Sequence, residues 1–428
     1  MKEWLKISLI LCLFGFLKEI RPSEPFIYEF LIDKQWRNVT DDQVTQEVYP
    51  VGIYAYLAQL VIVFLITDMC KYKPLIIVCG LSAIAVWALL LWTKTLFALQ
   101  VLEVLYGTFC ATEVAYYTYI YAKVDKEHYQ LVTSHTRAAI LAGRALSGII
   151  AQILVSFEIM DYRELNYITF TAMIFATLWA IFLPSANQSV YFHQDSKSAH
   201  SASEKTKSAL NKMRHHFFTS FSNPYIIKWS LWWTLNLCGY LQVQTYMQPL
   251  WSVIQTDKSK TIYNGAVEAI LTVLGFLGTL AGGVLKVDWP MKGELAMSII
   301  SLLEGFVLLY ISQTGSLEVG YVCYITFGGF FHFMITIASS EIAKNISEDG
   351  FGLVFGINTF FALVLQSIIT AVVVTKNVGF ALGPRDQYFV YGIFFIVVGA
   401  LYIVIGLSSW FTSKKDMRKA SIAVSNKI

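Results

Sequence analysis

Apolar residues gather along this chain in runs of about 20, separated by short polar segments. A helix needs roughly 20 predominantly apolar residues to cross a hydrocarbon core of about 30 Å, so each run predicts a membrane-spanning helix. Twelve spans are expected, at residues 4–20, 50–69, 74–93, 97–121, 134–157, 165–184, 226–250, 263–285, 293–312, 317–343, 350–375 and 387–411. The first run also has the lysines of a signal peptide, but no small-residue cleavage site follows it, and a retained first helix is preferred.

The longest polar interruption, residues 185–222, is rich in Ser, Lys and His and separates six spans from six. Two six-helix halves joined by a cytosolic linker predict an all-α membrane protein of the major facilitator architecture. The expected domains are an N-terminal half at 1–184, the linker at 185–222, a C-terminal half at 223–413 and a cytosolic tail at 414–428.

Composition supports this fold class and excludes others. Hydrophobic residues make up 56% of the chain and charged residues only 14%, against roughly 25% charged in soluble domains. A soluble enzyme, a disordered chain and a secreted disulfide scaffold are therefore excluded. The six cysteines are scattered without CxxC spacing, which predicts buried thiols rather than metal ligands. No metal, other cofactor or nucleic-acid partner is expected.

Lysine and arginine in the short loops set the expected orientation, because they are enriched on the cytosolic side. Their distribution places both termini in the cytosol of a multi-pass protein, with the plasma membrane as the expected location. The first outside loop then contains Asn38-Val39-Thr40, a glycosylation sequon. Asn38 is the predicted glycosylation site, whereas the sequon at Asn345 falls inside and should stay unmodified.

A few charged residues lie within the predicted spans, where an ionisable group costs about 2.5–3.5 kcal/mol to insert. Such groups usually face the interior of the helix bundle, and are therefore candidates for a functional site. They are Glu103, Glu113, Arg144, Glu268 and Glu304.

Glu113 has two interpretations. Tyr116 and Tyr117 follow it by three and four residues, so all three share a helix face. A carboxylate beside phenol rings suits a cationic aromatic ligand. Alternatively, Glu113 pairs with Arg144, since spans four and five are antiparallel neighbours and the two residues lie roughly 12 and 15 Å from the same end. The tyrosines alone would also fit an interfacial belt.

Span seven is unusually polar for a membrane helix. It contains Tyr240, Gln242, Gln244, Tyr246 and Gln248. Residues four apart share a face, so this pattern predicts either hydrogen bonds between helices or the wall of a polar cavity. Glu268 is expected at the outer end of span eight. The chain has no GxxxxGK[ST], HExxH or GxSxG motif, and we expect neither ATP-driven pumping nor enzymatic activity.

Several segments together resemble the family of reduced folate carriers and thiamine transporters. In chain order they are Arg21-Pro22-Ser23-Glu24-Pro25-Phe26, Tyr49-Pro50-Val51, Thr67-Asp68 with Tyr72-Lys73-Pro74, Glu113-Val114-Ala115-Tyr116-Tyr117, Glu127-His128-Tyr129-Gln130, Trp229-Ser230-Leu231-Trp232-Trp233, Ile262-Tyr263-Asn264-Gly265-Ala266-Val267-Glu268 and Val354-Phe355-Gly356-Ile357-Asn358-Thr359-Phe360. The resemblance implies a secondary transporter of a water-soluble B vitamin that works by alternating access.

The resemblance also implies a substrate type. Glu24, Glu113, Tyr116 and Glu268 match the thiamine type, whereas the basic positions expected of folate carriers fall on Glu113, Gly328 and Gln366 here. Three positions depart from the thiamine type, because a Trp, a Tyr and an Asn are expected where Gly52, Arg144 and Leu241 stand. The full predicted substrate site is Glu24, Tyr49, Glu113, Tyr116, Arg144, Tyr240, Gln244 and Glu268.

The sequence therefore predicts a vitamin transporter, with thiamine or a similar organic cation as the first choice and a folate as the second. A transporter-like nutrient receptor without flux is the alternative from another class. The expected partners are the vitamin, the lipid bilayer, and either coupling protons or exchanged anions.

Overall fold

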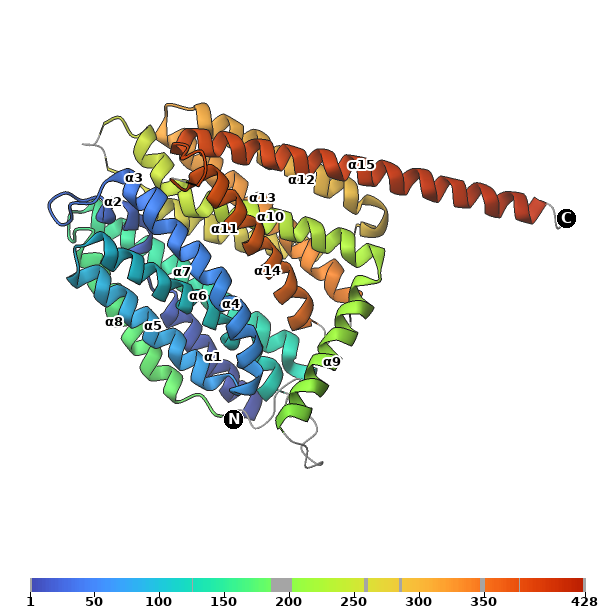
Figure 1. Cartoon of the computed structure of the whole chain (residues 1–428), viewed down its shortest axis with the longest axis horizontal. Helices are drawn as coiled ribbons and strands as arrows, with labels where there is room; N and C mark the ends of the chain where they lie inside the picture. Colours follow the sequence, from blue (N-terminus) through green and yellow to red (C-terminus); the bar gives the residue numbers. More distant parts are fainter. Residues whose placement is uncertain are drawn as a thin grey trace.

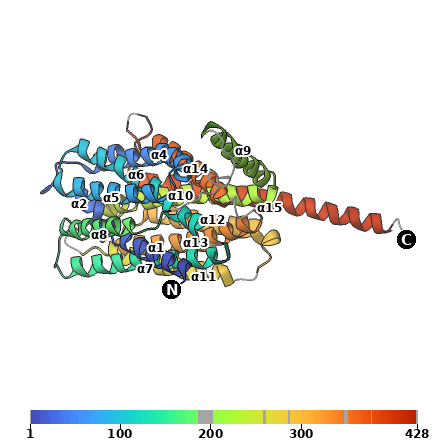
Figure 2. The same ribbon diagram turned by 90° about the horizontal axis from the view of Figure 1, so that it is seen from below.

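The computed structural model describes residues 2–124, 126–185, 202–257, 261–284, 287–346, 351–376 and 378–425. In these ranges the chain folds into long α-helices with short 3-10 and π-helical turns between them. The long helices lie side by side and form a bundle (Figures 1 and 2).

The N-terminal group of helices, as we call it, comprises α1 (Glu3–Lys18), α4 (Tyr49–Met69), α5 (Lys73–Trp92), α6 (Leu96–Lys123), α7 (Tyr129–Ser156) and α8 (Glu164–Ile181). Within it α1 packs against α7 and α8, and α6 packs against α4 and α5. Pro50 and Pro74 stand in the first turns of α4 and α5, where a missing N–H breaks no helical bond. Thr95 caps α6, its hydroxyl accepting from the Ala98 N–H at 3.2 Å.

The C-terminal group comprises α10 (Pro224–Ile254), α11 (Asn264–Val284), α12 (Trp289–Gln313), α13 (Leu317–Lys344), α14 (Phe351–Ile369) with the π-turn η5 (Thr370–Val374), and α15 (Pro384–Ser425). Here α12 packs along α15, and α10 contacts α13, α14 and α15. Caps again start the helices: the Asn223 side chain accepts from the Tyr225 N–H at 2.9 Å, and Ser316 accepts from Val319.

The long helices follow the predicted spans closely, but the count of twelve stays a prediction. Ten helices of the described chain are long and apolar enough to cross a membrane. The other two predicted spans fall on α1, which has 16 residues, and on α10, whose glutamines lower its hydropathy. Both are packed within the bundle.

Several short elements are not predicted by hydropathy. Between α1 and α4 the chain forms η1 (Glu24–Phe26), α2 (Ile27–Leu31), α3 (Asp41–Gln43) and the π-turn η2 (Val44–Val48). The predicted linker contains a helix, α9 (Ala202–Phe221), while its residues 186–201 lie outside the described ranges. The helix α15 continues past the predicted span to Ser425, through most of the predicted tail, and projects beyond the other helices in Figure 1.

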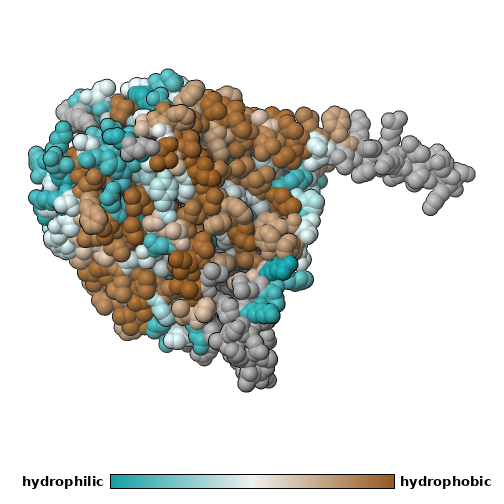
Figure 3. All heavy atoms as spheres, in the orientation of Figure 1, coloured by the Kyte–Doolittle hydropathy of each residue, from teal (hydrophilic) through white to brown (hydrophobic). Residues whose placement is uncertain are grey.

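The surface shows where a bilayer would lie. In Figure 3 hydrophobic residues cover much of the side of the bundle, and hydrophilic residues gather at the end that carries α2 and α3. Large apolar side chains are exposed on several helices, for example Leu81 on α5, Phe175 on α8 and Val397 on α15. A soluble protein seldom exposes apolar patches of this extent, so the surface is typical of lipid contact.

The two groups of helices meet along α4–α14 and α7–α11. Many of the hydrogen bonds between them lie at the end of the bundle near η1. Gln248 of α10 donates to the Glu24 carbonyl at 2.8 Å and accepts from the Tyr28 N–H at 3.1 Å. Asn264 of α11 donates to the Pro25 carbonyl at 3.0 Å. These bonds hold the two groups together at that end.

Two glycines permit the close crossing of α7 and α11. A Cβ added at Gly148 would lie 2.7 Å from the Gly265 carbonyl oxygen, and one added at Gly265 would lie 2.8 Å from the Gly148 carbonyl oxygen. Because the obstacle is backbone in both cases, a side chain at either position would force the helices apart. Gln152 then bonds across the crossing to the Ile262 carbonyl and the Ala266 N–H.

We predict that Gly265→Ala lowers the stability of the protein by about 1–3 kcal/mol, because overpacking at a rigid contact strains the backbone. Thermal unfolding of the purified protein in detergent measures this. The matched control is Gly329→Ala in α13, where a Cβ would meet nothing within 4 Å. Equal melting temperatures for the two variants would contradict the prediction.

Candidate functional site

Six charged side chains form one contact network where α1 ends, which we call the α1 charge cluster: Lys18, Glu19, Arg21, Glu24, Glu113 and Arg144. Its centre is Glu19, whose side chain is 1% exposed. The Glu19 carboxylate contacts Lys18 Nζ at 2.9 Å and Arg21 Nη2 at 2.7 Å. Three cations and three carboxylates balance, which lowers the cost of burying them.

Glu113 and Arg144 take separate partners in this cluster. Glu113 Oε1 pairs with the Lys18 ammonium and accepts from the Tyr117 hydroxyl at 3.0 Å. Arg144 binds Glu19 Oε2 through both Nε, at 3.2 Å, and Nη2, at 3.1 Å. The direct Glu113–Arg144 pair that helix depth permits is therefore wrong. Each residue meets a partner from α1 instead, because α1 packs against α7 and brings its charged end to them.

Sequence reasoning missed Lys18 and Glu19 as site residues. They end the first apolar run, where charged residues usually mark the membrane boundary, so the pattern along the chain does not single them out as interior charges. In the structure both are 2% exposed. The signal was present in the dense series Lys18-Glu19-Ile20-Arg21, whose alternating signs suit an internal network.

The two tyrosines after Glu113 have different roles. Tyr117 is bonded to Glu113, as a residue four positions on in a helix should be. Tyr116 is 1% exposed, its hydroxyl donates to the Leu11 carbonyl at 3.0 Å, and its ring packs on Phe14. Tyr116 therefore ties α6 to α1 within the N-terminal group, and Tyr117 is the aromatic partner that the predicted site lacked.

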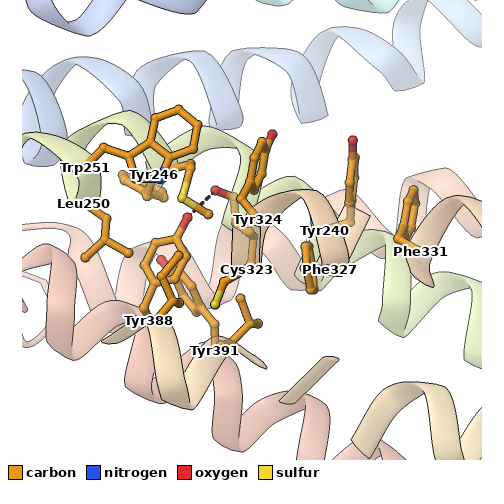
Figure 4. Packing of buried hydrophobic residues seen from close by; sticks show 14 of the residues in the cluster. Tyr240, Tyr246, Leu250, Trp251, Cys323, Tyr324, Phe327, Phe331, Tyr388 and Tyr391 are labelled. Carbon is orange, nitrogen blue, oxygen red and sulfur yellow. Dashed lines mark hydrogen bonds between the residues drawn. The ribbon is translucent and has the colours of Figure 1, made fainter. Parts of the chain in front are cut away.

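The C-terminal group faces the α1 charge cluster with aromatic side chains and one carboxylate. Glu268 of α11 accepts from the Tyr324 hydroxyl at 3.2 Å. Tyr240 of α10 stacks on Phe331 with ring centroids 3.8 Å apart. Figure 4 shows Tyr240 and Tyr324 side by side, with both hydroxyls directed to the same side. Arg144 lies one turn before Gly148 on α7, and Glu268 lies about one turn after Gly265 on α11, so the close approach of these two glycines brings both residues to the same interface.

The other predicted site residues have different surroundings. The Glu24 carboxylate pairs with Arg21, and its carbonyl holds Gln248. Tyr49 of α4 meets Tyr246 of α10 edge to face, with centroids 6.1 Å apart. Gln244 is an exposed residue of α10, whereas Gln242 is buried and accepts from the Thr370 hydroxyl. The polar residues of α10 thus bond mainly to neighbouring segments.

Gly52 leaves a space that Glu103 fills. A Cβ at Gly52 would fall on the Glu103 carboxylate, 2.2 Å from Oε2. Where the resemblance leads us to expect a tryptophan, a carboxyl group from α6 stands instead. Glu304 lies elsewhere: it is fully buried in the C-terminal group and accepts from Asn236 Nδ2 at 2.8 Å. It is therefore a packing residue of that group and does not border the interface.

The arrangement brings charge of both signs and aromatic rings to the interface of two helix groups. The accessible groups include Glu113, whose side chain is 25% exposed, and Arg144, at 41%. Such a site can bind a small polar molecule through ion pairs and ring stacking.

Comparison with known proteins identifies the family. The family model for the reduced folate carrier matches residues 2–390. The chain belongs to the reduced folate carrier family. Its family and fold are those of transporters.

Curated relatives in this family include both vitamin types. The chain is 35% identical to human thiamine transporter 2, over 97% of this chain and 92% of that protein. It is 36% identical to folate-like transporter 3 of Caenorhabditis elegans, over 95% and 96%. It is 35% identical to folate transporter 1 of the same worm, over 98% and 95%. The resemblance drawn from the sequence motifs is confirmed.

Solved structures confirm the fold class. The nucleoside transporter NupG superposes with a TM-score of 0.64 at 15% identity, covering 93% of this chain and 98% of that one. A POT family transporter bound to a conjugated peptide gives a TM-score of 0.66 at 11% identity, over 94% and 96%. At these identities the likeness shows the major facilitator type of fold alone.

We predict that the pairing in the α1 charge cluster is measurable by double-mutant cycles. Glu19→Gln and Arg144→Gln should couple by about 0.5–3 kcal/mol, since the double variant removes both charges of a contact. Glu113→Gln and Arg144→Gln should couple less, because they share no direct contact. Unfolding free energies of the purified variants provide the measurement, and the reverse order of coupling would contradict the structure.

Proposed function

We propose that this chain carries a water-soluble B vitamin across the plasma membrane by alternating access of one site between the two helix groups. The single observation that supports this most is the α1 charge cluster facing Glu268, Tyr240 and Tyr324 across the interface. A buried set of charges between two helix groups is the usual position of a transporter binding site.

The bonds between the helix groups support alternating access as the mechanism. The contacts of Gln248 with Glu24 and Tyr28, and of Asn264 with Pro25, are few and polar. They are therefore bonds that one group can exchange for others as it rocks against its neighbour. In the predicted orientation they close the outside end, and the α1 charge cluster lies behind them.

Thiamine or a similar organic cation is the first choice of substrate. Glu113, Glu24 and Glu268 supply carboxylates, and Tyr117, Tyr240 and Tyr324 supply rings beside them. A folate is the second choice, since the exposed Arg144 guanidinium suits an anion. Protons or exchanged anions remain the proposed coupled species.

Uptake of labelled thiamine and folate in transporter-null cells tests this choice. We expect thiamine uptake that Glu113→Gln lowers about 10- to 100-fold, because a hydrogen bond to a charged group contributes about 1.5–3 kcal/mol. The control is Glu3→Gln, an exposed glutamate at the start of α1.

Folate uptake that survives Glu113→Gln, with no thiamine uptake, would reject the first choice. Saturable binding without accumulation inside vesicles would favour the receptor without flux, the alternative class of function.

The proposed orientation has its own test. Asn38 and Thr40 are exposed in the loop after α2, so we expect Asn38 to be glycosylated on the outside when both termini are cytosolic. The glycoprotein should shift in electrophoretic mobility on treatment with an amidase that removes N-glycans, and Asn38→Gln should abolish the shift. Persistence of the shift in that variant, or its loss only in Asn345→Gln, would contradict the orientation.

A further inference from the structure

The Lys18 ammonium sits against the carboxylate that the proposed function gives to an organic cation. The Lys18 side chain is 3% exposed and its amine contacts both Glu113 and Glu19. Glu113 itself is 25% exposed, so a ligand can reach it. The Lys18 ammonium therefore already pairs with Glu113, the carboxylate that is the first candidate for binding an organic cation.

The Lys18–Glu113 pair makes the positive and negative charges of the α1 charge cluster equal in number. Lys18, Arg21 and Arg144 carry three positive charges, and Glu19, Glu24 and Glu113 carry three negative ones. The α1 charge cluster is thus neutral before any substrate binds. Within the cluster Lys18 therefore cancels the negative charge of Glu113, and the attraction for a cation falls because it follows the local charge. Glu268, across the interface and outside the cluster, supplies a further carboxylate.

The exposure of the charged side chains also favours an anionic ligand over a cationic one. Arg144 is 41% exposed, whereas its partner Glu19 is 1% exposed beneath it. An anionic group can approach Arg144 without separating any ion pair of the cluster. A cationic group that reaches the exposed part of Glu113 meets a carboxylate whose charge the buried Lys18 ammonium already offsets.

We infer that Lys18 is a specificity-determining residue: its tethered ammonium acts as an internal counter-ion of Glu113, weakening organic cations relative to organic anions in this carrier. This rests on the proposed vitamin site. A thiamine-like substrate shares Glu113 with the Lys18 ammonium, which already offsets part of the charge of that carboxylate. A substrate with a carboxylate binds toward Arg144 and leaves the Lys18–Glu113 pair intact.

The test compares dissociation constants of purified wild-type and variant carriers for labelled thiamine and labelled folate. In Lys18→Met the cluster holds two cations and three carboxylates. We expect thiamine to bind about tenfold more tightly, which corresponds to about 1.4 kcal/mol, and folate to bind no more tightly than before. An unchanged ratio of the two constants, or weaker thiamine binding, would overturn the inference.

Three further variants keep the result interpretable. Lys18→Gln retains an N–H donor for Glu113 without the charge, and should shift the ratio in the same direction if Lys18→Met fails to fold. Lys18→Met combined with Glu113→Gln restores neutrality and should abolish the gain in thiamine binding. The matched control is Lys228→Met, which breaks the Lys228–Glu294 pair in the C-terminal group, away from the interface. It should leave both dissociation constants unchanged.

The outcomes separate this inference from the proposed function. A wild-type carrier that binds a vitamin while both Lys18 variants keep its thiamine-to-folate ratio defeats the inference alone. A wild-type carrier that neither binds nor transports any B vitamin of a competition panel defeats the proposed function, and the inference with it.

Discussion

Charge balance at the end of α1 is the constraint on which the remainder of this interface depends. Charged groups in a membrane-embedded bundle cost several kcal/mol each unless they are paired. Glu19 meets this constraint for three cations at once, through contacts with Lys18, Arg21 and Arg144. Because those partners come from α1, the segment after it and α7, the network also fixes how α1 lies against α7.

The same constraint explains which residues remain available to a ligand. Arg21 and Glu19 are buried and ion-paired with each other, so they act as the support of the site. Glu113, Glu24 and Arg144 are partly exposed at the edge of the network. In the proposed site a cationic substrate meets carboxylates that are already paired, whereas an anionic substrate meets the exposed side of Arg144. Selectivity then depends on the relative strength of internal and external ion pairs.

Alternating access requires an interface between the two helix groups that is closely packed and can still separate. Gly148 and Gly265 let α7 and α11 cross with backbone against backbone, a packing mode that membrane helices use widely. The polar contacts of Gln248 and Asn264 close one end of the interface. Beside the site, Tyr240 stacks on Phe327 and Phe331 within the C-terminal group. Rigid groups with a polar interface suit a rocking motion.

The sequence by itself determined the long helices, the fold class and the family, because apolar runs of membrane length and a series of ordered motifs are local signals. It also predicts Glu113, Arg144, Tyr240 and Glu268 as residues of the substrate site, which stays a prediction. Only the tertiary structure decided which side chains contact each other. Lys18 and Glu19 are covered because α7 and α8 pack over α1, Tyr116 turns to Leu11 while Tyr117 turns to Glu113, and Glu103 fills the space at Gly52. Ion pairs depend on which helices are neighbours and on the rotation of each helix, and hydropathy along the chain encodes neither.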